Sequence, residues 1–535
     1  MKHLSFRIFL SAIIILISLF LTYFLCVLGW LSQINILPYS FLSAFILTTI
    51  ILFSLKNYLN IERKDYFLST FIAIVVLILS SIISLFFYDQ SFDGQWYHQM
   101  AIHHLASQWN PTINPNTTES IYVGYYPKAM ETISAAIVSL FDEMEMGKAI
   151  NLLFIFVLWG YSLKFCEIFF SNLKNKIKYL LSIVICLCPV SAYQCFTYYI
   201  DYIGYVFFVI VLICLYFIEI NKKTNIKNNI LEFATLSVIV SLSIAIKLNI
   251  AFWIILSLTI YLITLIIRKK YLLMKTSIVV GICSILFGIF VLGFNPYVTN
   301  IQNGNALLYP LIGENKEDIL TANTPQVLLN ENRFKQIWLS YSHRPSEYKL
   351  YRSITKIWDG HKSEMTHSDN RIGGFGAFFI EIFVMAVILI LLSNKQNRKA
   401  FFILLSLEIF LLSSLLLVQG GWWARYVPFF YLFVLLPLLY VFKYSMHFKI
   451  IKYVVLVLIV YNFAFHFHLC AKKSHRYKYT IEHTLKEFEN NQPIHLKSTN
   501  FGIRYKMEKH KINYIEDGKA DKMVDGIWPP VYVLK

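Results

Sequence analysis

The segment Asp89-Gln-Ser-Phe-Asp-Gly-Gln-Trp-Tyr-His98 places two carboxylates, a glycine and a histidine directly after a long apolar run. A carboxylate in this position could take the proton of an attacking hydroxyl, which is the role of a general base. Asp93 is the candidate for that role. Asp is also a favoured N-cap residue, so Asp93 could instead begin the helix predicted up to Trp109, and the two roles can coexist.

Neighbouring ionisable residues suggest two metal interpretations. Asp89 precedes Asp93 by four residues, so the two would share a face if the helix begins that early. Asp89 is also a candidate for contact with substrate. It could raise the pKa of Asp93 by repulsion, or both could hold a divalent cation. His98, His103 and His104 do not have the i, i+4 spacing of a helical zinc pair. That spacing favours a polar interfacial face, with His98 a candidate for contact with substrate.

Three cations could stabilise the negative charge that develops on a leaving phosphate. Lys247 interrupts an apolar stretch, where an ionisable residue is expensive, although it could also snorkel to the interface. Arg425 follows two tryptophans and could equally be an aromatic-belt anchor. Arg371 precedes Gly-Gly-Phe-Gly and could be a solvated loop charge. A further group lies in a loop where spacing constrains little, so a solvated surface is favoured over a ligand set: His361, Glu364, His367 and Asp369.

The elements that carry these residues belong to an unusually apolar chain. Of 535 residues, 57% are hydrophobic and only 15% are charged, against roughly 25% charged in ordinary globular proteins. The apolar residues form blocks of about 20 residues, which matches a bilayer core of ~30 Å. We therefore predict an all-α polytopic membrane protein rather than a soluble enzyme.

The net charge of +17 does not indicate nucleic-acid binding, because Lys and Arg lie in short clusters between apolar blocks, as the positive-inside rule requires. All eight Cys lie in or beside apolar segments. This arrangement argues against a disulfide framework and against a Cys-based zinc site.

The apolar pattern predicts about thirteen transmembrane helices. They are expected at 8–29, 38–55, 66–88, 148–169, 178–195, 199–219, 230–246, 249–267, 272–293, 375–393, 400–418, 426–442 and 450–469. Basic connections alternate with connections nearly free of Lys and Arg, which places the N-terminus in the cytoplasm and the C-terminal tail outside. The critical step is 230–267, which must turn back on itself near Lys247.

Five regions follow from this pattern: an N-terminal hairpin (1–65), a transmembrane module (66–293) with a first outer loop (89–147), a large outer loop (294–374), C-terminal transmembrane helices (375–470) and a small α+β tail (471–535). The amphipathic run Ala129–Phe141 predicts an interfacial helix. The second outer loop, of about 80 residues, is long enough to be a lid or a site wall.

Several landmarks occur in order along the predicted outer side. They are Asp93-Gly-Gln-Trp-Tyr-His98, Tyr126-Pro127 followed by Glu131, Asn295-Pro-Tyr-Val-Thr-Asn300 with Gly304-Asn-Ala-Leu-Leu-Tyr-Pro310, Arg371-Ile-Gly-Gly-Phe-Gly376, and Gly421-Trp-Trp-Ala-Arg-Tyr-Val-Pro428. Each is weak alone, but their order and common side are more specific. Together they resemble the bacterial GT-C-type membrane glycosyltransferases, over roughly residues 66–440.

The resemblance implies an enzyme of the bacterial cytoplasmic membrane that moves a sugar from a polyprenyl-phosphate donor to a cell-envelope glycan or lipid acceptor. It also implies an essential aspartate in the first large outer loop, which would be Asp93. In that family the loop usually follows the first span, whereas here two predicted spans precede it, so residues 1–65 would be an added hairpin.

Two other classes remain open. An envelope-polysaccharide polymerase or ligase would also have many spans and a large outer loop, but should rely on Arg and His more than on Asp93. A transporter or lipid flippase would place its site near the bilayer midplane. The two long outer segments and the scarcity of midplane charges count against transport.

Overall fold

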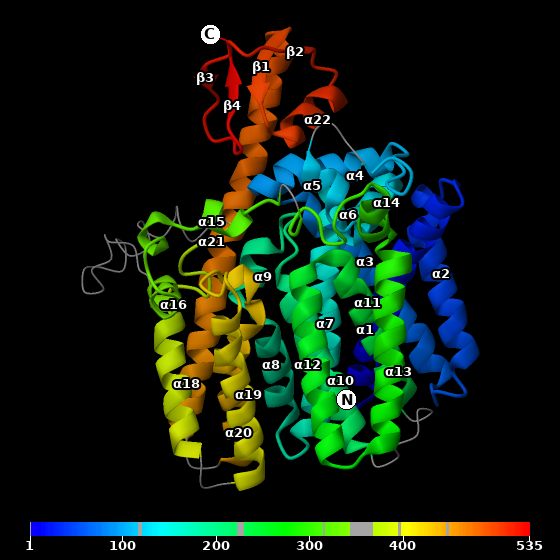
Figure 1. The fold of residues 1–535 in the computed structure, drawn as a ribbon, viewed down its shortest axis with the longest axis vertical. Helices are drawn as coiled ribbons and strands as arrows, with labels where there is room; N and C mark the ends of the chain where they lie inside the picture. Colours follow the sequence, from blue (N-terminus) through cyan, green and yellow to red (C-terminus); the bar gives the residue numbers. More distant parts are fainter. Residues whose placement is uncertain are drawn as a thin grey trace.

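The computed structural model describes residues 2–115, 120–221, 229–313, 316–342, 368–393, 397–445 and 449–534. These residues form a helical bundle with a small sheet at one end (Figure 1). Within the described ranges, nine helices are long and apolar enough to cross a membrane. The chain is therefore a polytopic helical membrane protein.

The long apolar helices are α1 (Lys2–Leu31), α2 (Leu37–Leu55), α3 (Arg63–Leu85), α7 (Ala149–Phe169), α10 (Tyr202–Ile220), α12 (Leu248–Ile267), α13 (Tyr271–Phe287), α19 (Arg398–Leu417) and α21 (Lys449–Asn490). Shorter helices occupy the other predicted spans: α8 (Asn175–Cys186), α11 (Ile230–Ile246), α18 (Phe379–Ser393) and α20 (Leu432–Tyr444). Since these four are short for a full crossing, the number of spans stays a prediction.

The chain reverses direction at Lys247, as the predicted topology requires. Lys247 has an extended backbone and separates α11 from α12. At the start of α11, Asn229 bonds Asn221, which follows the end of α10. At the end of α12, Arg268 pairs with Glu219 of α10. Helix α11 is therefore antiparallel to both α10 and α12, and Lys247 lies at the turn between α11 and α12.

Helix α1 is built into the bundle rather than attached to its edge. It packs against α2, α3 and α7. A side chain at Gly160 of α7 would place its Cβ 2.5 Å from the Cβ of Ala12, so the two helices approach closely there. The predicted N-terminal hairpin thus shares the core of the molecule.

Short helices cover the end of the bundle that carries the first predicted outer loop (Figure 1): α4 (Gln99–Ala106), α5 (Ile121–Tyr125), α6 (Ala129–Phe141), α14 (Thr299–Gln302) and α15 (Ile319–Asn323). The other short elements are η1 (Gly94–His98), η2 (Met144–Lys148), α9 (Pro189–Gln194), η4 (Gly288–Leu292), η5 (Phe294–Val298), η6 (Gln326–Leu328), α16 (Arg333–Ser342), η7 (Ala424–Tyr426) and η8 (Pro428–Tyr431). Helix α6 has the predicted bounds, but it is buried on most sides rather than lying half exposed.

The C-terminal tail is an α+β unit, as predicted. Its strands β1 (Ile494–Ser498), β2 (Tyr514–Glu516), β3 (Lys522–Met523) and β4 (Val531–Val533) form a sheet in the order β2-β1-β4-β3, with α22 (Phe501–Lys509) beside it. β1 is parallel to β2 and antiparallel to β4, with Leu496 opposite Val533.

Helix α21 carries this tail away from the bundle. Its 42 residues correspond to a length of about 63 Å, twice the ~30 Å bilayer core. The boundary predicted at residue 470 lies inside this helix. Figure 1 shows the tail above the end of the bundle that contains α4, α5 and α6.

Candidate functional site

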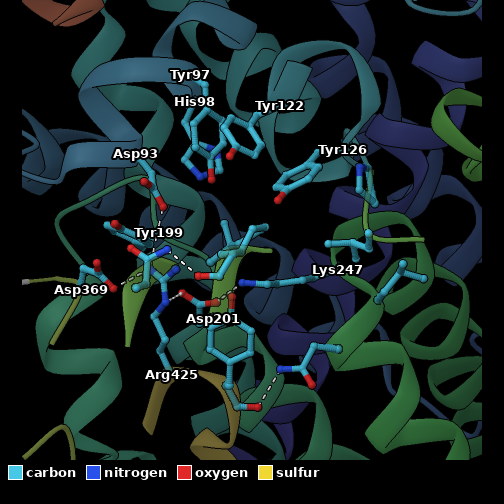
Figure 2. Close-up of a pocket in the computed structure, with 18 of the residues that line it drawn as sticks. Asp93, Tyr97, His98, Tyr122, Tyr126, Tyr199, Asp201, Lys247, Asp369 and Arg425 are labelled. Carbon is cyan, nitrogen blue, oxygen red and sulfur yellow. Dashed lines mark hydrogen bonds and ion pairs between the residues drawn. The ribbon is translucent and has the colours of Figure 1, made fainter. Parts of the chain in front are cut away.

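A cavity of about 840 Å³ lies at this end of the bundle. Segments far apart in the sequence line it, including η1, the residues before α10, the α11–α12 turn and η7. The sequence candidates on its wall are Asp93, His98, Lys247, Arg371 and Arg425. In Figure 2, Tyr97, His98, Tyr122 and Tyr126 lie in the upper part of the view and Asp201, Lys247, Asp369 and Arg425 in the lower part, with Asp93 at the left between the two groups.

Asp93 does not cap the helix that it begins. Its side chain makes no capping hydrogen bond. Ser91 performs that function, because its Oγ accepts a hydrogen bond of 3.1 Å from the backbone N–H of Gly94. The Asp93 carboxylate is thus free of the structural role that its position suggested, and it opens onto the cavity.

Gly94 makes this local geometry possible. A Cβ at Gly94 would lie 1.9 Å from Oδ2 of Asp89 and 2.2 Å from Oγ of Ser91. The turn that follows, Gly94–His98, is π-helical, with the N–H of Gln99 bonded to the carbonyl of Gly94. Such turns are rare and occur often at functional sites.

Asp89 was expected at the site, either as a substrate contact or as a metal ligand with Asp93, but the structure places it behind the cavity wall. Its Oδ1 accepts hydrogen bonds from Ser91 N and Oγ at 2.8 and 2.7 Å, and its Oδ2 accepts one from Tyr198 N at 3.1 Å. Burial raises the pKa of Asp89 to about 6, although Lys148 and the Ser91 hydrogen bonds oppose the shift. Asp89 therefore fixes the loop, because its oxygens are occupied within the protein.

Arg425 lies where three carboxylates converge. Its Nη1 is 3.0 Å from Asp369 and 3.8 Å from Asp93, and its Nε is 3.8 Å from Asp201. The residue is only 9% exposed. Within the described part of the chain, neither Nε nor Nη1 has a hydrogen-bond acceptor in good geometry. Both donors are held in ion pairs rather than in well-aligned hydrogen bonds, and the residue lines the cavity.

The aromatic-belt interpretation of Arg425 is wrong. The two preceding tryptophans, Trp422 and Trp423, are 2% and 0% exposed, so neither faces lipid. The Arg425 guanidinium lies over the ring of Trp423 at 4.3 Å and over that of Tyr199 at 4.9 Å. Trp423, which stacks on Trp422, thus packs against the guanidinium of Arg425, and Arg425 lines the cavity.

Lys247 pairs with a carboxylate that sequence analysis did not single out. Its Nζ contacts Oδ1 of the buried Asp201, and Asp201 also accepts a hydrogen bond of 3.0 Å from Gln194. The Lys247 side chain remains 28% exposed, and its Nζ lies 5.0 Å from the ring of Tyr426. Lys247 and Arg425 thus share Asp201 and line the same cavity.

Arg371 and Asp369 belong to one loop beside Arg425. Arg371 donates hydrogen bonds to Asn323 at 2.6 Å and to Asp369 at 3.3 Å. A Cβ at Gly374 would lie 2.6 Å from that of Ala424, so the glycines of this segment let the loop pack against η7.

Asp369 was expected on a solvated surface, but its side chain is only 20% exposed and pairs with Arg425. Burial raises the pKa of the Asp369 carboxyl, while Arg425 lowers it. The other members of the predicted loop cluster, His361, Glu364 and His367, lie outside the described residues.

His98 is held on the cavity wall by Glu131. Its Nδ1 lies 2.8 Å from Glu131 Oε1, and both residues are buried. His103 faces other surroundings, with its ring 5.5 Å from that of Phe501 in the tail. Across the described ranges, no three His, Cys, Asp or Glu residues are grouped to hold a metal ion.

Three residues that line the cavity were not among the predicted site residues: Tyr199, Asp201 and Trp528 of the tail. Asp201 carried a usable signal, because it is an ionisable residue inside the stretch predicted as the 199–219 span, as Lys247 is at its own position. Tyr199 and Trp528 could not be recognised from the sequence, because aromatic residues are common throughout this chain.

Comparison with known proteins gives no match, whether to a family model, to a curated protein or to a solved structure.

Proposed function

We propose that this protein is a membrane glycosyltransferase that moves one sugar from a polyprenyl-phosphate donor to a cell-envelope glycan or lipid. The reaction would take place on the outer side of a bacterial cytoplasmic membrane, with the N-terminus inside and the tail outside. The cavity lies at the end of the bundle that carries the tail and the first predicted outer loop.

The observation that carries this proposal is the state of Arg425. A buried guanidinium whose Nε and Nη1 form ion pairs but no well-aligned hydrogen bond within the described residues, in a cavity that it shares with Lys247, is suited to a phosphate. Phosphate gains charge as its bond to the sugar breaks, and cations fixed in advance stabilise that change. Aromatic and apolar side chains on the same wall suit the rest of a lipid-linked sugar.

Asp93 is the proposed base. The acceptor hydroxyl attacks the anomeric carbon, the bond from that carbon to the phosphate oxygen breaks with its electron pair, and the hydroxyl proton passes to Asp93. Its carboxylate lies 3.8 Å from Arg425. An inverting displacement places the acceptor hydroxyl and the leaving phosphate on opposite faces of the anomeric carbon, so Asp93 would act on one face of the sugar and Arg425 on the other, within the cavity that both residues line.

Replacing Asp93 with Asn tests the proposal. The amide keeps the shape of the side chain but cannot accept the proton, and loss of a general base costs about 10²–10⁴-fold in rate. The assay follows transfer from radiolabelled polyprenyl-phosphate hexoses and pentoses in membranes that contain the protein. Asp521→Asn, on the exposed surface of the tail, is the matched control.

We expect Asp93→Asn to reach the membrane in normal amount and to lose transfer, and Asp521→Asn to retain it. Transfer at the normal rate by Asp93→Asn would remove the base from the mechanism. Because Ser91 already caps the helix, a fall in transfer cannot be attributed to a lost cap.

A further inference from the structure

The tail contributes one side chain to the cavity, the indole of Trp528. This side chain belongs to the wall of the proposed site, although Trp528 lies 38 residues after Asn490, where α21 ends. Trp528 is 46% exposed. Ligand cavities are lined mainly by apolar and aromatic side chains.

The backbone around Trp528 is fixed although the ring is open. Tyr477 of α21 donates a hydrogen bond of 3.0 Å to the carbonyl of Trp528. Asn500, which is fully buried, donates one of 3.2 Å to the carbonyl of Pro529. These hydrogen bonds hold the backbone of the folded tail in a position that leaves the Trp528 ring exposed.

Two further aromatic residues adjoin Trp528 on the same wall. The ring of Phe92 lies 5.9 Å from that of Trp528 and 5.7 Å from that of Trp96, and all three residues line the cavity. Phe92 is the residue directly before Asp93. We call Phe92, Trp96 and Trp528 the aromatic rim.

Buried contacts hold the two halves of this rim together. Lys506 of α22 pairs with Glu145 at 2.7 Å, and their side chains are only 10% and 3% exposed. A Cβ at Gly502 would lie 1.8 Å from Oε1 of Gln95 in η1, so α22 rests directly on the turn that follows Asp93. The tail is a fixed part of the cavity wall.

We propose that the aromatic rim binds a pyranose ring of the acceptor, which makes the acceptor of the proposed transfer a glycan; this inference rests on the proposed function. Aromatic faces carry negative potential, and the C–H bonds on one face of a pyranose present weakly positive hydrogens to it. Asp93 and Arg371 line the same cavity and supply hydrogen-bond partners for hydroxyl groups.

The position of the rim favours a sugar over the prenyl chain of the donor. Trp528 is carried by the sheet unit beyond the end of α21, whose about 63 Å length exceeds the ~30 Å apolar core. The rim is next to the proposed base through Phe92 and Asp93. An acceptor ring stacked there would bring a hydroxyl toward Asp93 from the side of the tail.

Binding of soluble glycans to the purified full-length protein tests this inference without requiring transfer. The probes are cellotetraose, maltotetraose, mannotetraose and chitotetraose, followed by saturation-transfer NMR. The variants are Trp528→Ala, Trp528→Tyr and, on the bundle side of the rim, Phe92→Leu. Trp338→Ala is the matched control, because Trp338 of α16 is 54% exposed and does not line the cavity.

We expect at least one tetrasaccharide to bind. Trp528→Ala and Phe92→Leu should each weaken that binding about three- to tenfold, the range for an aromatic contact. Trp528→Tyr should retain part of the tetrasaccharide binding, and Trp338→Ala should bind as tightly as the unaltered protein. Limited proteolysis of each variant shows whether the tail is still docked, and Phe92→Leu tests the rim even if Trp528→Ala releases the tail.

The inference is overturned if no tetrasaccharide binds the unaltered protein, if the rim variants bind normally, or if Trp338→Ala weakens binding equally. The proposed function fails separately: Asp93→Asn would then transfer sugar normally while glycan binding still depended on Trp528. Conversely, loss of transfer in Asp93→Asn with normal glycan binding in the rim variants would overturn only the inference.

Discussion

At the scale of single residues, Arg425 is held by rings and carboxylates together. The indole of Trp423 lies behind the guanidinium, while Asp369, Asp93 and Asp201 approach it from three different segments. Lys could supply the same charge but not the planar fork of donors that binds two phosphate oxygens in parallel. Geometry as well as charge should therefore matter at this position.

We predict that Arg425→Lys impairs sugar transfer and that Arg425→Ala impairs it more severely, with membrane insertion intact in both. By analogy with lost oxyanion contacts, removal of the guanidinium should cost about 2–4 kcal/mol of transition-state stabilisation. The measurement is the initial rate with a saturating and with a limiting concentration of the polyprenyl-phosphate donor.

Arg398→Lys is the control, because Arg398 is an exposed residue at the start of α19 and does not line the cavity. Full activity in Arg425→Ala would reduce Arg425 to a structural partner of the three aspartates and would leave Lys247 and Arg371 as the candidates for the phosphate.

At the scale of elements, two separate sets of contacts hold the turn η1 in place. Asp89, in the loop before η1, accepts hydrogen bonds from Ser91 and Tyr198. Helix α22 of the tail packs on Gln95 of η1, where Gly502 leaves room for the amide. The position of Asp93 thus depends on an element that lies about 400 residues later in the chain.

We predict that Lys506→Met loosens the tail from the bundle. The substitution leaves the buried carboxylate of Glu145 with Lys148 as its remaining partner, and breaking a buried ion pair costs about 3–5 kcal/mol when no partner remains. The loss here should be smaller than that. It should appear as faster release of the tail by trypsin from the detergent-solubilised protein.

Lys497→Met on β1 controls for the lost cleavage site and charge, because Lys497 is exposed on the same unit. Equal proteolysis of Lys506→Met and the unaltered protein would mean that other contacts, such as the packing at Gly502 and the ion pair of Lys509 with Glu143, keep the tail docked without the buried ion pair.

At the scale of the whole molecule, the cavity and the tail lie at one end and several basic connections lie at the other. Glu219, Arg268 and Lys270 form ion pairs at that other end. The turn at Lys247 between α11 and α12 lies at the cavity. This separation agrees with a molecule whose basic end faces the cytoplasm.

We predict that a reporter fused after Leu534 responds as extracytoplasmic, because the alternation of basic loops places the tail outside. The matched control is a reporter inserted after Ser393 at the end of α18, which should respond as cytoplasmic. Cytoplasmic activity at the tail would mean that the number of crossings is even and that one of the four shorter helices does not cross.

Much of the fold could be predicted because apolar periodicity and length act locally. The pattern located the long helices, the reversal at Lys247, the bounds of α6 and the α+β character of the tail. It did not show that α21 continues unbroken to Asn490, because the apolar pattern ends near residue 469. Contacts such as the hydrogen bond from Ser474 to the carbonyl of Tyr88 join this extension to the bundle.

The sequence by itself determined that the chain spans a membrane and that Asp93, Lys247 and Arg425 are unusual in their surroundings, because the cost of placing charge beside apolar segments depends on local composition alone. Only the tertiary structure decided which partners they have. Asp201 neutralises Lys247, Ser91 replaces Asp93 as the cap, and Trp528 reaches the cavity through folding of the tail. Such contacts join residues far apart in the chain, so no spacing in the sequence encodes them.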